Sequence, residues 1–171
     1  MDADTIRRTL GLEPLPNEGG FFVETYRATR RVPVDALPAH PTERALATAI
    51  YYLITPGSFS AMHRVRSDEI FHFYMGDPVV MLQLGPGDDG RVVTIGTDLA
   101  DGARPQVVVP GGVWQGARLA PGGAWALLGT TVSPGFEFED YEHGARAALI
   151  ARWPEWRAEI EALMRGQAVS E

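Results

Sequence analysis

Between Phe21 and Ser133 the chain alternates short apolar runs with turn-forming sequences, and this pattern limits the possible folds more than any other feature. Turns such as TPGS, MGDP, GPGDDG, DLADG, VPGG and APGG separate the runs. Many short strands at this spacing predict an antiparallel sandwich or barrel, and GDDG between two runs predicts a hairpin. The predicted strands are FFVETYRA, LATAIYYLIT, EIFHFYM, VVMLQLG, RVVTIGT, QVVVP, VWQGARL and AWALLGTTVS.

Helical patterns lie at the two ends of the chain. At the start, Asp2 or Asp4 can cap a helix over residues 2–10 that ends at Gly11. At the other end, apolar residues recur at helical spacing over residues 144–166, with Pro154 suited to the first turn of a second helix. We therefore expect a single domain over residues 1–171, with a barrel at about 18–140 and a helical tail at about 144–166.

Composition excludes several classes of partner. The net charge of −7 and pI of about 5.1 argue against nucleic acid and anionic membrane surfaces, because both bind clustered positive charge. The sequence has no apolar run of 18 residues and no apolar signal-peptide core near its start. It contains no cysteine, which excludes disulfides, thiolate ligands and a cysteine nucleophile. These features favour a cytoplasmic protein.

The stretch GSFSAMHRVRSDEIFHFYMGD contains the strongest candidate site. Alternate residues of a strand face the same side, so Glu69, Phe71 and Phe73 share one face while His72 lies on the other. If His63 on the preceding strand points into the barrel, the short connection brings Glu69 beside it. An imidazole and a carboxylate in an apolar cavity shift each other's pKa, which is the setting for proton transfer.

The spacing of Gly57, His63, Val65, Glu69 and Gly76 resembles the first motif of the cupin superfamily. Val65 stands where that motif normally has a second histidine. A candidate second motif, VPGGVWQGARL, has Gln115 where cupins usually carry a third histidine. The resemblance therefore implies a pocket that keeps one histidine and one glutamate of the usual metal ligands. We expect no cofactor, and the alternative is a divalent metal held by His63, Glu69 and Gln115.

A wider set of segments is similar to the cupin 5 family, formerly domain of unknown function 985. The similarity covers about residues 5–155 and departs from the family at Pro16-Asn17, where members often have His-Pro. It implies an all-β fold, a double-stranded β-helix or jelly-roll barrel, with a ligand-sized pocket and usually a homodimer. The helical patterns add short helices at both ends. The segments are EGGFFVETYR, AIYYLITPGSFSAMHRVRSDEIFHFYMGDP, PQVVVPGGVWQGARL and VSPGFEFEDYEHG.

Three functions remain open from the sequence. The first is a metal-independent enzyme that transfers protons on a small polar, carbohydrate-like or carboxylate-bearing molecule, as an epimerase, isomerase or lyase. His63 would be its base, Glu69 the acid or orienting partner, and Gln115 a donor to a substrate oxygen, with His72 as a further catalytic candidate. The second is a small-molecule-binding module without catalysis. The third is a metal-dependent oxygenase or isomerase.

Further ligand-binding candidates are the aromatic residues Phe71, Phe73 and Tyr51, although aromatic residues in barrels are more often core. Glu24 is a candidate because its strand is distantly similar to the opening strand of sugar-nucleotide 3,5-epimerases, with Gly19 where those have an arginine. Simple alternation places Glu24 with Phe22 and Tyr26, and Arg27 on the opposite face. The alternation in GFEFEDYE predicts a half-buried edge strand near residues 135–142.

Overall fold

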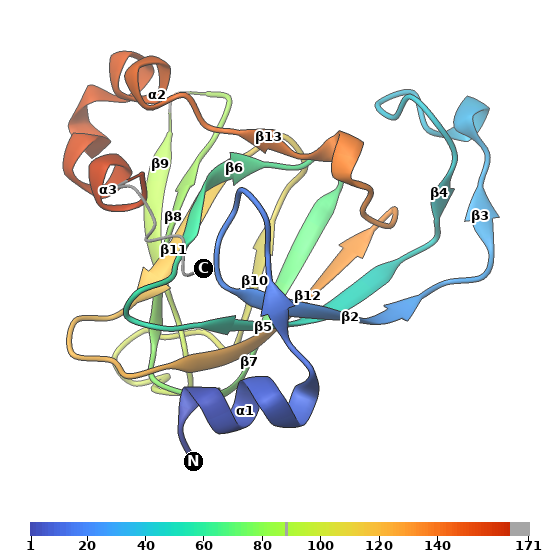
Figure 1. The fold of residues 1–171 in the computed structure, drawn as a ribbon. Helices are drawn as coiled ribbons and strands as arrows, with labels where there is room; N and C mark the ends of the chain where they lie inside the picture. The colour runs from blue at the N-terminus through green and yellow to red at the C-terminus, as the bar shows by residue number, and fades with distance from the viewer. Residues whose placement is uncertain (88, 165–171) are drawn as a thin grey trace.

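The computed structural model describes residues 1–87 and 89–164, and it consists mainly of two antiparallel β-sheets that face each other (Figure 1). In the larger sheet the order is β1-β2-β5-β12-β7-β10. Its strands are β1 (Glu13–Pro14), β2 (Phe21–Arg27), β5 (Thr48–Ile54), β12 (Ala126–Ser133), β7 (Asp68–Gly76) and β10 (Gln106–Val109).

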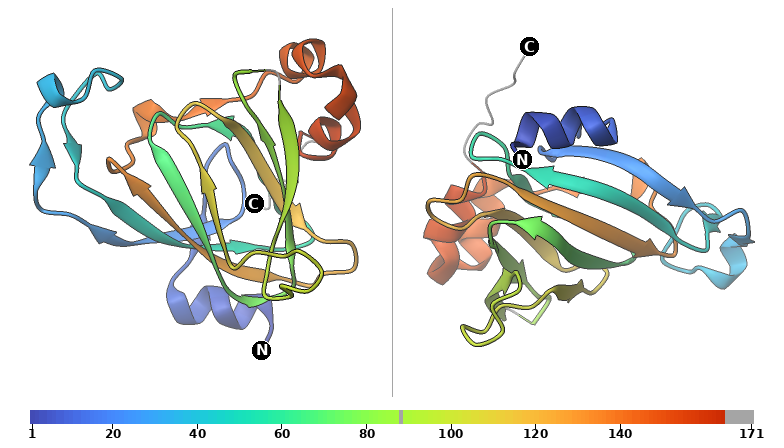
Figure 2. Two further views of the ribbon diagram at one scale, coloured as in Figure 1. Left: turned by 180° about the vertical axis from the view of Figure 1, so that it is seen from behind. Right: turned by 90° about the horizontal axis from the view of Figure 1, so that it is seen from below.

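The second sheet has the order β13-β6-β11-β8-β9. Its strands are β13 (Glu142–His143), β6 (Ser60–Arg64), β11 (Trp114–Leu119), β8 (Val79–Leu84) and β9 (Gly90–Ile95). A separate ribbon of β3 (Arg31–Val32) and β4 (Arg44–Ala45) extends away from the two sheets (Figures 1 and 2). The helices are α1 (Ala3–Leu10), α2 (Arg146–Arg152) and α3 (Arg157–Ala162), with 3-10 turns η1 (Val34–Ala36), η2 (Phe138–Asp140) and η3 (Pro154–Trp156).

The main core lies between the two sheets, where strands of both contribute inward-facing side chains. Tyr52, Phe71 and Leu128 from the larger sheet belong to the same buried cluster as Met81 and Ala117 from the smaller one. Neighbours in each sheet come from distant parts of the chain, as β5, β12 and β7 do. This arrangement confirms the predicted all-β jelly-roll fold, and the eight strands predicted between Phe21 and Ser133 are all present.

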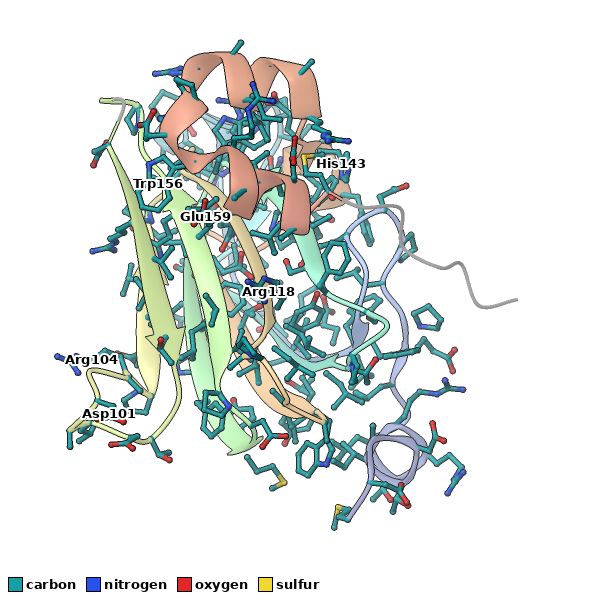
Figure 3. All side chains as sticks on the ribbon, turned by 90° about the vertical axis from the view of Figure 1, so that its left-hand side faces the viewer. Asp101, Arg104, Arg118, His143, Trp156 and Glu159 are labelled. Atoms are coloured by element: carbon teal, nitrogen blue, oxygen red, sulfur yellow. The ribbon has the colours of Figure 1, made fainter. Side chains whose placement is uncertain are left out.

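Helices cover the outer faces of the two sheets. Asp2 caps α1 by accepting a hydrogen bond from the Thr5 amide at 2.8 Å, Gly11 ends it in the left-handed conformation, and Ile6 packs on the larger sheet. The C-terminal helices pack Trp153 and Ile160 on the smaller sheet. Trp156, which is labelled in Figure 3, lies so close to Gly90 that a Cβ atom there would overlap its indole ring. Residues 165 and 166 of the predicted tail lie outside the described residues.

Two local predictions were wrong. A β-bulge between Glu24 and Tyr26 shifts the register of β2 against β5, so that Arg27 shares the inner side with Glu24. Within GFEFEDYE, Phe138–Asp140 form the 3-10 turn η2, and a strand begins only at Glu142. Phe138 is 60% exposed whereas Asp140 is buried, because Asp140 pairs with the buried Arg44. Within the described ranges, no helix has the length and apolar character needed to cross a bilayer.

The turn before β2 depends on Gly20, so replacing this glycine should destabilise the fold. Gly20 has φ of +76°, and a Cβ atom there would lie 2.6 Å from the ring of the buried Tyr52. We expect Gly20→Ala to lower the free energy of unfolding by about 2–3 kcal/mol, from backbone strain together with overpacking. Gly102 has φ of +82° in open space, so Gly102→Ala should cost about 1 kcal/mol. Equal losses in urea unfolding would contradict the steric part of this account.

Candidate functional site

A pocket of about 100 Å³ opens between the sheets, beside the loop that joins β1 to β2. Its walls come from this loop, from β2, β5, β6, β7 and β12, and from the segment that follows β12. Apolar side chains such as Phe22, Ile50 and Val132 form most of the surface. Pockets for drug-sized ligands are larger, about 300–1,000 Å³. This pocket therefore suits a ligand of only a few non-hydrogen atoms.

His63 projects into this pocket from β6 and is 1% exposed. Its Nδ1 lies 2.8 Å from the carbonyl oxygen of Ala61, two residues earlier on the same strand. A carbonyl can only accept, so Nδ1 carries the hydrogen and Nε2 of the neutral ring has a free lone pair. The ring stacks on Tyr141, with centroids 5.2 Å apart. The strand thus presents His63 Nε2 to the pocket as a proton acceptor.

The Glu18 carboxylate lies beside the His63 ring. Its Oε2 lies 3.8 Å from His63 Nε2, and its Oε1 accepts a hydrogen bond from the Ser60 hydroxyl at 2.8 Å. Its backbone carbonyl accepts a hydrogen bond from the Ala61 amide at 2.9 Å, which ties the loop to β6. Sequence reasoning did not select Glu18 as a site residue. The sequence feature that could have indicated Glu18 is its position directly before Gly19-Gly20. That segment was interpreted only as a tight entry into β2.

Glu69 enters the same pocket from β7 and is 8% exposed. Its Oε2 accepts a hydrogen bond from Gln115 Nε2 at 2.7 Å, and the Thr130 hydroxyl also donates to this carboxyl. Burial raises the pKa of Glu69, and the nearby Glu18 carboxylate raises it further, against the opposing effects of His63, Thr130 and Gln115. The Glu69 carboxyl is therefore more able to hold a proton than an exposed glutamate.

The raised pKa of Glu69 predicts the pH dependence of a variant. The folded protein binds the Glu69 proton more tightly than the unfolded chain, so the stability from this group is complete below the ordinary value of 4.5. That stability is lost as the pH rises through the raised pKa. Glutamine is uncharged at every pH, so the Tm of Glu69→Gln should rise relative to wild type between about pH 4.5 and pH 8.

Differential scanning fluorimetry across this pH range measures the Tm difference. Glu13→Gln is the matched control, because Glu13 is exposed in β1 and does not line the pocket. Its Tm difference from wild type should stay flat. A flat or falling difference for Glu69→Gln would contradict a raised pKa at Glu69.

Arg27 binds two carboxylates at the edge of the pocket. It donates to Glu24 through Nε at 3.0 Å and a terminal nitrogen at 2.8 Å, and to Glu137 through its other terminal nitrogen at 2.7 Å. It also donates to the Phe136 carbonyl oxygen at 3.2 Å. The bulge in β2 makes this arrangement, since it brings Arg27 to the same side as Glu24. The guanidinium charge is thereby compensated within the protein.

The structure brings His63, Glu69 and Glu24 to one pocket and places the other predicted residues elsewhere. Phe71 is buried in the core between the sheets, and Phe73 packs against that core.

His72 lies on the other side of β7, with Nε2 3.1 Å from the Thr131 hydroxyl. Tyr51 meets Tyr74 edge to face, centroids 5.8 Å apart, in a groove beside α1. Gln115 is buried behind Glu69, and its amide nitrogen binds that carboxyl.

The residues at the expected metal-ligand positions do not fit a metal ion. Val65 contributes hydrocarbon to the pocket wall, and the Gln115 amide nitrogen donates to one oxygen of the Glu69 carboxyl. Over residues 1–87 and 89–164, no group of three or more histidine, aspartate or glutamate side chains is arranged to hold an ion. Transition metals and zinc bind where several imidazole, thiolate or carboxylate ligands converge.

Several proteins of known structure or sequence are similar to this chain. A protein of Saccharomyces cerevisiae named Uncharacterized protein YML079W is 33% identical over 141 residues, which are 72% of this chain and 66% of the yeast protein. This chain therefore matches slightly less than two thirds of that relative's length. Protein SO0799 from Shewanella oneidensis is 33% identical, with a TM-score of 0.85 over 96% of this chain and 98% of that one.

A hypothetical protein from Leishmania major is 30% identical, with a TM-score of 0.84 over 95% of this chain and 98% of that one. Oxalate decarboxylase from Bacillus subtilis is 13% identical with a TM-score of 0.52, over 91% of this chain and 38% of that one, which shows a shared fold alone. The family model described as Cupin superfamily (DUF985) matches residues 4–144. The chain therefore belongs to this family, cupin 5 of the cupin superfamily.

Proposed function

We propose that this protein is a metal-independent enzyme that transfers protons on a small polar molecule. The observation that carries the proposal is the pairing of two groups in one pocket: the acceptor Nε2 of His63 and the Glu69 carboxyl with its raised pKa. Enzymes that act as acid and base near neutral pH use groups with perturbed pKa values in such a setting. The class of reaction is epimerisation, isomerisation or elimination.

Each pocket residue has a separate role in the proposed reaction. His63 Nε2 takes a proton from the substrate, and the charge that develops on the ring is stabilised by the Glu18 carboxylate 3.8 Å away. The protonated Glu69 carboxyl donates a proton to a second position of the substrate, so that no net proton is gained or lost. Gln115 holds Glu69 by its hydrogen bond and acts as a positioning residue. The apolar lining keeps water from competing for the proton.

A binding module without catalysis is the second candidate. It is favoured by the hydrogen bonds from Gln115 and Thr130, which already satisfy the Glu69 carboxyl without a ligand.

The proposal also includes a homodimer, supported by exposed apolar side chains on the larger sheet, including Tyr74, Met75 and Val108. A cytoplasmic location is part of the same proposal, supported by the absence of cysteine from the sequence.

Proton exchange with heavy water separates the two candidates. Small hydroxy- and amino-carbonyl compounds of three or four carbons are incubated with the protein in D₂O, and loss of each C–H signal is followed by proton NMR. An enzyme of the proposed class incorporates deuterium next to the carbonyl group of its substrate. Binding of a compound, seen as a Tm shift, without any deuterium incorporation across the set would favour the binding module instead.

A further inference from the structure

Among the described residues that line the pocket, Arg27 is the only arginine or lysine, so it is the side chain best suited to bind an anionic ligand. The structure directs its hydrogen bonds to the protein instead. Its three nitrogens donate to both carboxyl oxygens of Glu24, to one of Glu137 and to the Phe136 carbonyl oxygen, at 2.7–3.2 Å. One positive charge thus lies between two negative charges. We call Glu24, Arg27 and Glu137 the charged bridge.

The fold holds the charged bridge in place at the edge of the pocket. Glu24 and Arg27 lie on β2, where the bulge brings them to the same side. Glu137 follows β12, 110 residues further along the chain than Arg27. Its neighbour Phe136 donates a hydrogen bond from its amide to the Thr48 hydroxyl at 3.0 Å. A ligand that bound Arg27 would therefore have to displace charge-assisted hydrogen bonds that are already formed.

The inner end of the pocket is also unsuited to an anion. His63 Nε2 is a proton acceptor, because Nδ1 donates to the Ala61 carbonyl oxygen. The donor groups of Gln115 and Thr130 are directed to the Glu69 carboxyl. A carboxylate or phosphate group at this end would lose its water without gaining a cation, which is costly in an apolar cavity. An uncharged group does not have this cost.

We propose that the charged bridge excludes anions from the pocket, and that the substrate is a small carbonyl compound without a carboxylate or phosphate group. The inference rests on the proposed function, whose substrate it narrows. A neutral imidazole removes a proton from carbon where a neighbouring carbonyl group takes up the electron pair. The C–H bond breaks as His63 Nε2 gains the proton, and the carbonyl oxygen gains a proton from the Glu69 carboxyl, which gives a neutral enol. The Nε2 lone pair stays available for this step.

Two compounds of four carbons test the exclusion on the wild-type protein. They are 4-hydroxy-2-butanone, which is uncharged, and acetoacetate, which has a carboxylate in place of the terminal CH₂OH group. Dissociation constants are measured at pH 7 by ligand-observed NMR. We expect the hydroxy ketone to bind about tenfold more tightly, or better. Equal binding, tighter binding of acetoacetate, or binding of neither compound overturns the inference.

Variants of the charged bridge then test its role. Glu24→Gln/Glu137→Gln leaves Arg27 without a carboxylate partner, so acetoacetate should bind about tenfold more tightly than to wild type, with little change for the hydroxy ketone. Adding Arg27→Met should abolish this gain. Glu43→Gln is the matched control, because Glu43 is an exposed partner of Arg31 outside the pocket. Unchanged acetoacetate affinity in the double variant would show that the charged bridge does not exclude anions.

Glu137→Gln alone keeps the pair of Glu24 and Arg27, so the test does not depend on the folding of the double variant. It should give a smaller gain for acetoacetate, and the absence of any gain would also overturn the role of the charged bridge. None of these binding measurements needs turnover. Exclusion of acetoacetate without deuterium exchange on any compound would refute the enzyme and leave the inference in place. Exchange on carboxylates, with no preference for uncharged compounds, would refute the inference and leave the enzyme in place.

Discussion

Replacing His63 with glutamine should lower the rate of proton exchange by a factor of about 10² to 10⁴, the usual contribution of a general base. Glutamine has nearly the size of histidine and can still donate a hydrogen bond, but it cannot accept a proton near neutral pH. The measurement is the rate of deuterium incorporation, in D₂O, into the substrate found by the exchange experiment described above. Because Nε2 is the proposed reacting atom, the rate at saturating substrate should fall more than the affinity.

His72→Gln is the matched control for this loss. It makes the same chemical change nine positions along the chain, on the side of β7 away from the pocket, and should leave the rate within about twofold. If His63→Gln keeps the wild-type rate, or if both variants lose activity equally, His63 is not the base. A variant that binds ligand as wild type does and has lost exchange would identify a role in the chemical step.

The largest expected loss of stability comes from Arg44. Its side chain is fully buried, and it donates through Nε and a terminal nitrogen, both at 2.7 Å, to the two carboxyl oxygens of Asp140. Arg44→Met leaves that carboxylate buried without its main partner, since Arg66 lies 3.4 Å away on the exposed side. We expect the free energy of unfolding to fall by about 3–5 kcal/mol, as measured by urea titration.

Arg31→Met is the control for Arg44, because Arg31 forms an exposed pair with Glu43 in the same ribbon and should cost at most about 1 kcal/mol. The double variant Arg44→Met/Asp140→Leu should recover most of the loss, since it removes both buried charges. Comparable losses for the Arg44 and Arg31 single variants would contradict this account. Asp140 precedes Tyr141, so the Arg44 variant should also weaken ligand binding.

The fold could be predicted from the sequence because its signals are local. Alternating apolar residues identified the strands, and Asp2 and Gly11 identified the ends of the first helix. The shared pocket of His63 and Glu69 was also predicted, since strand parity and a short connection constrain both side chains. These inferences needed no information about distant parts of the chain.

The rest of the site depends on contacts between distant segments. Glu18 reaches His63 through the hydrogen bond of its carbonyl to Ala61, which no local pattern indicates. Arg27 reaches the pocket because a bulge inverts the parity of β2 after Glu24. The segment around Phe138 becomes a 3-10 turn because Asp140 is drawn to Arg44, 96 residues away. In each case a long-range interaction determines the local conformation.

The hydrogen bond from His63 to Ala61 has a consequence for how this pocket can change during evolution. In many acid–base sites a separate side chain orients the histidine, and its loss disables the base. Here the main chain of the same strand does so, and a main-chain carbonyl is present whatever residue occupies position 61. Mutations elsewhere in the lining can therefore alter which molecule is accepted without altering the proton acceptor.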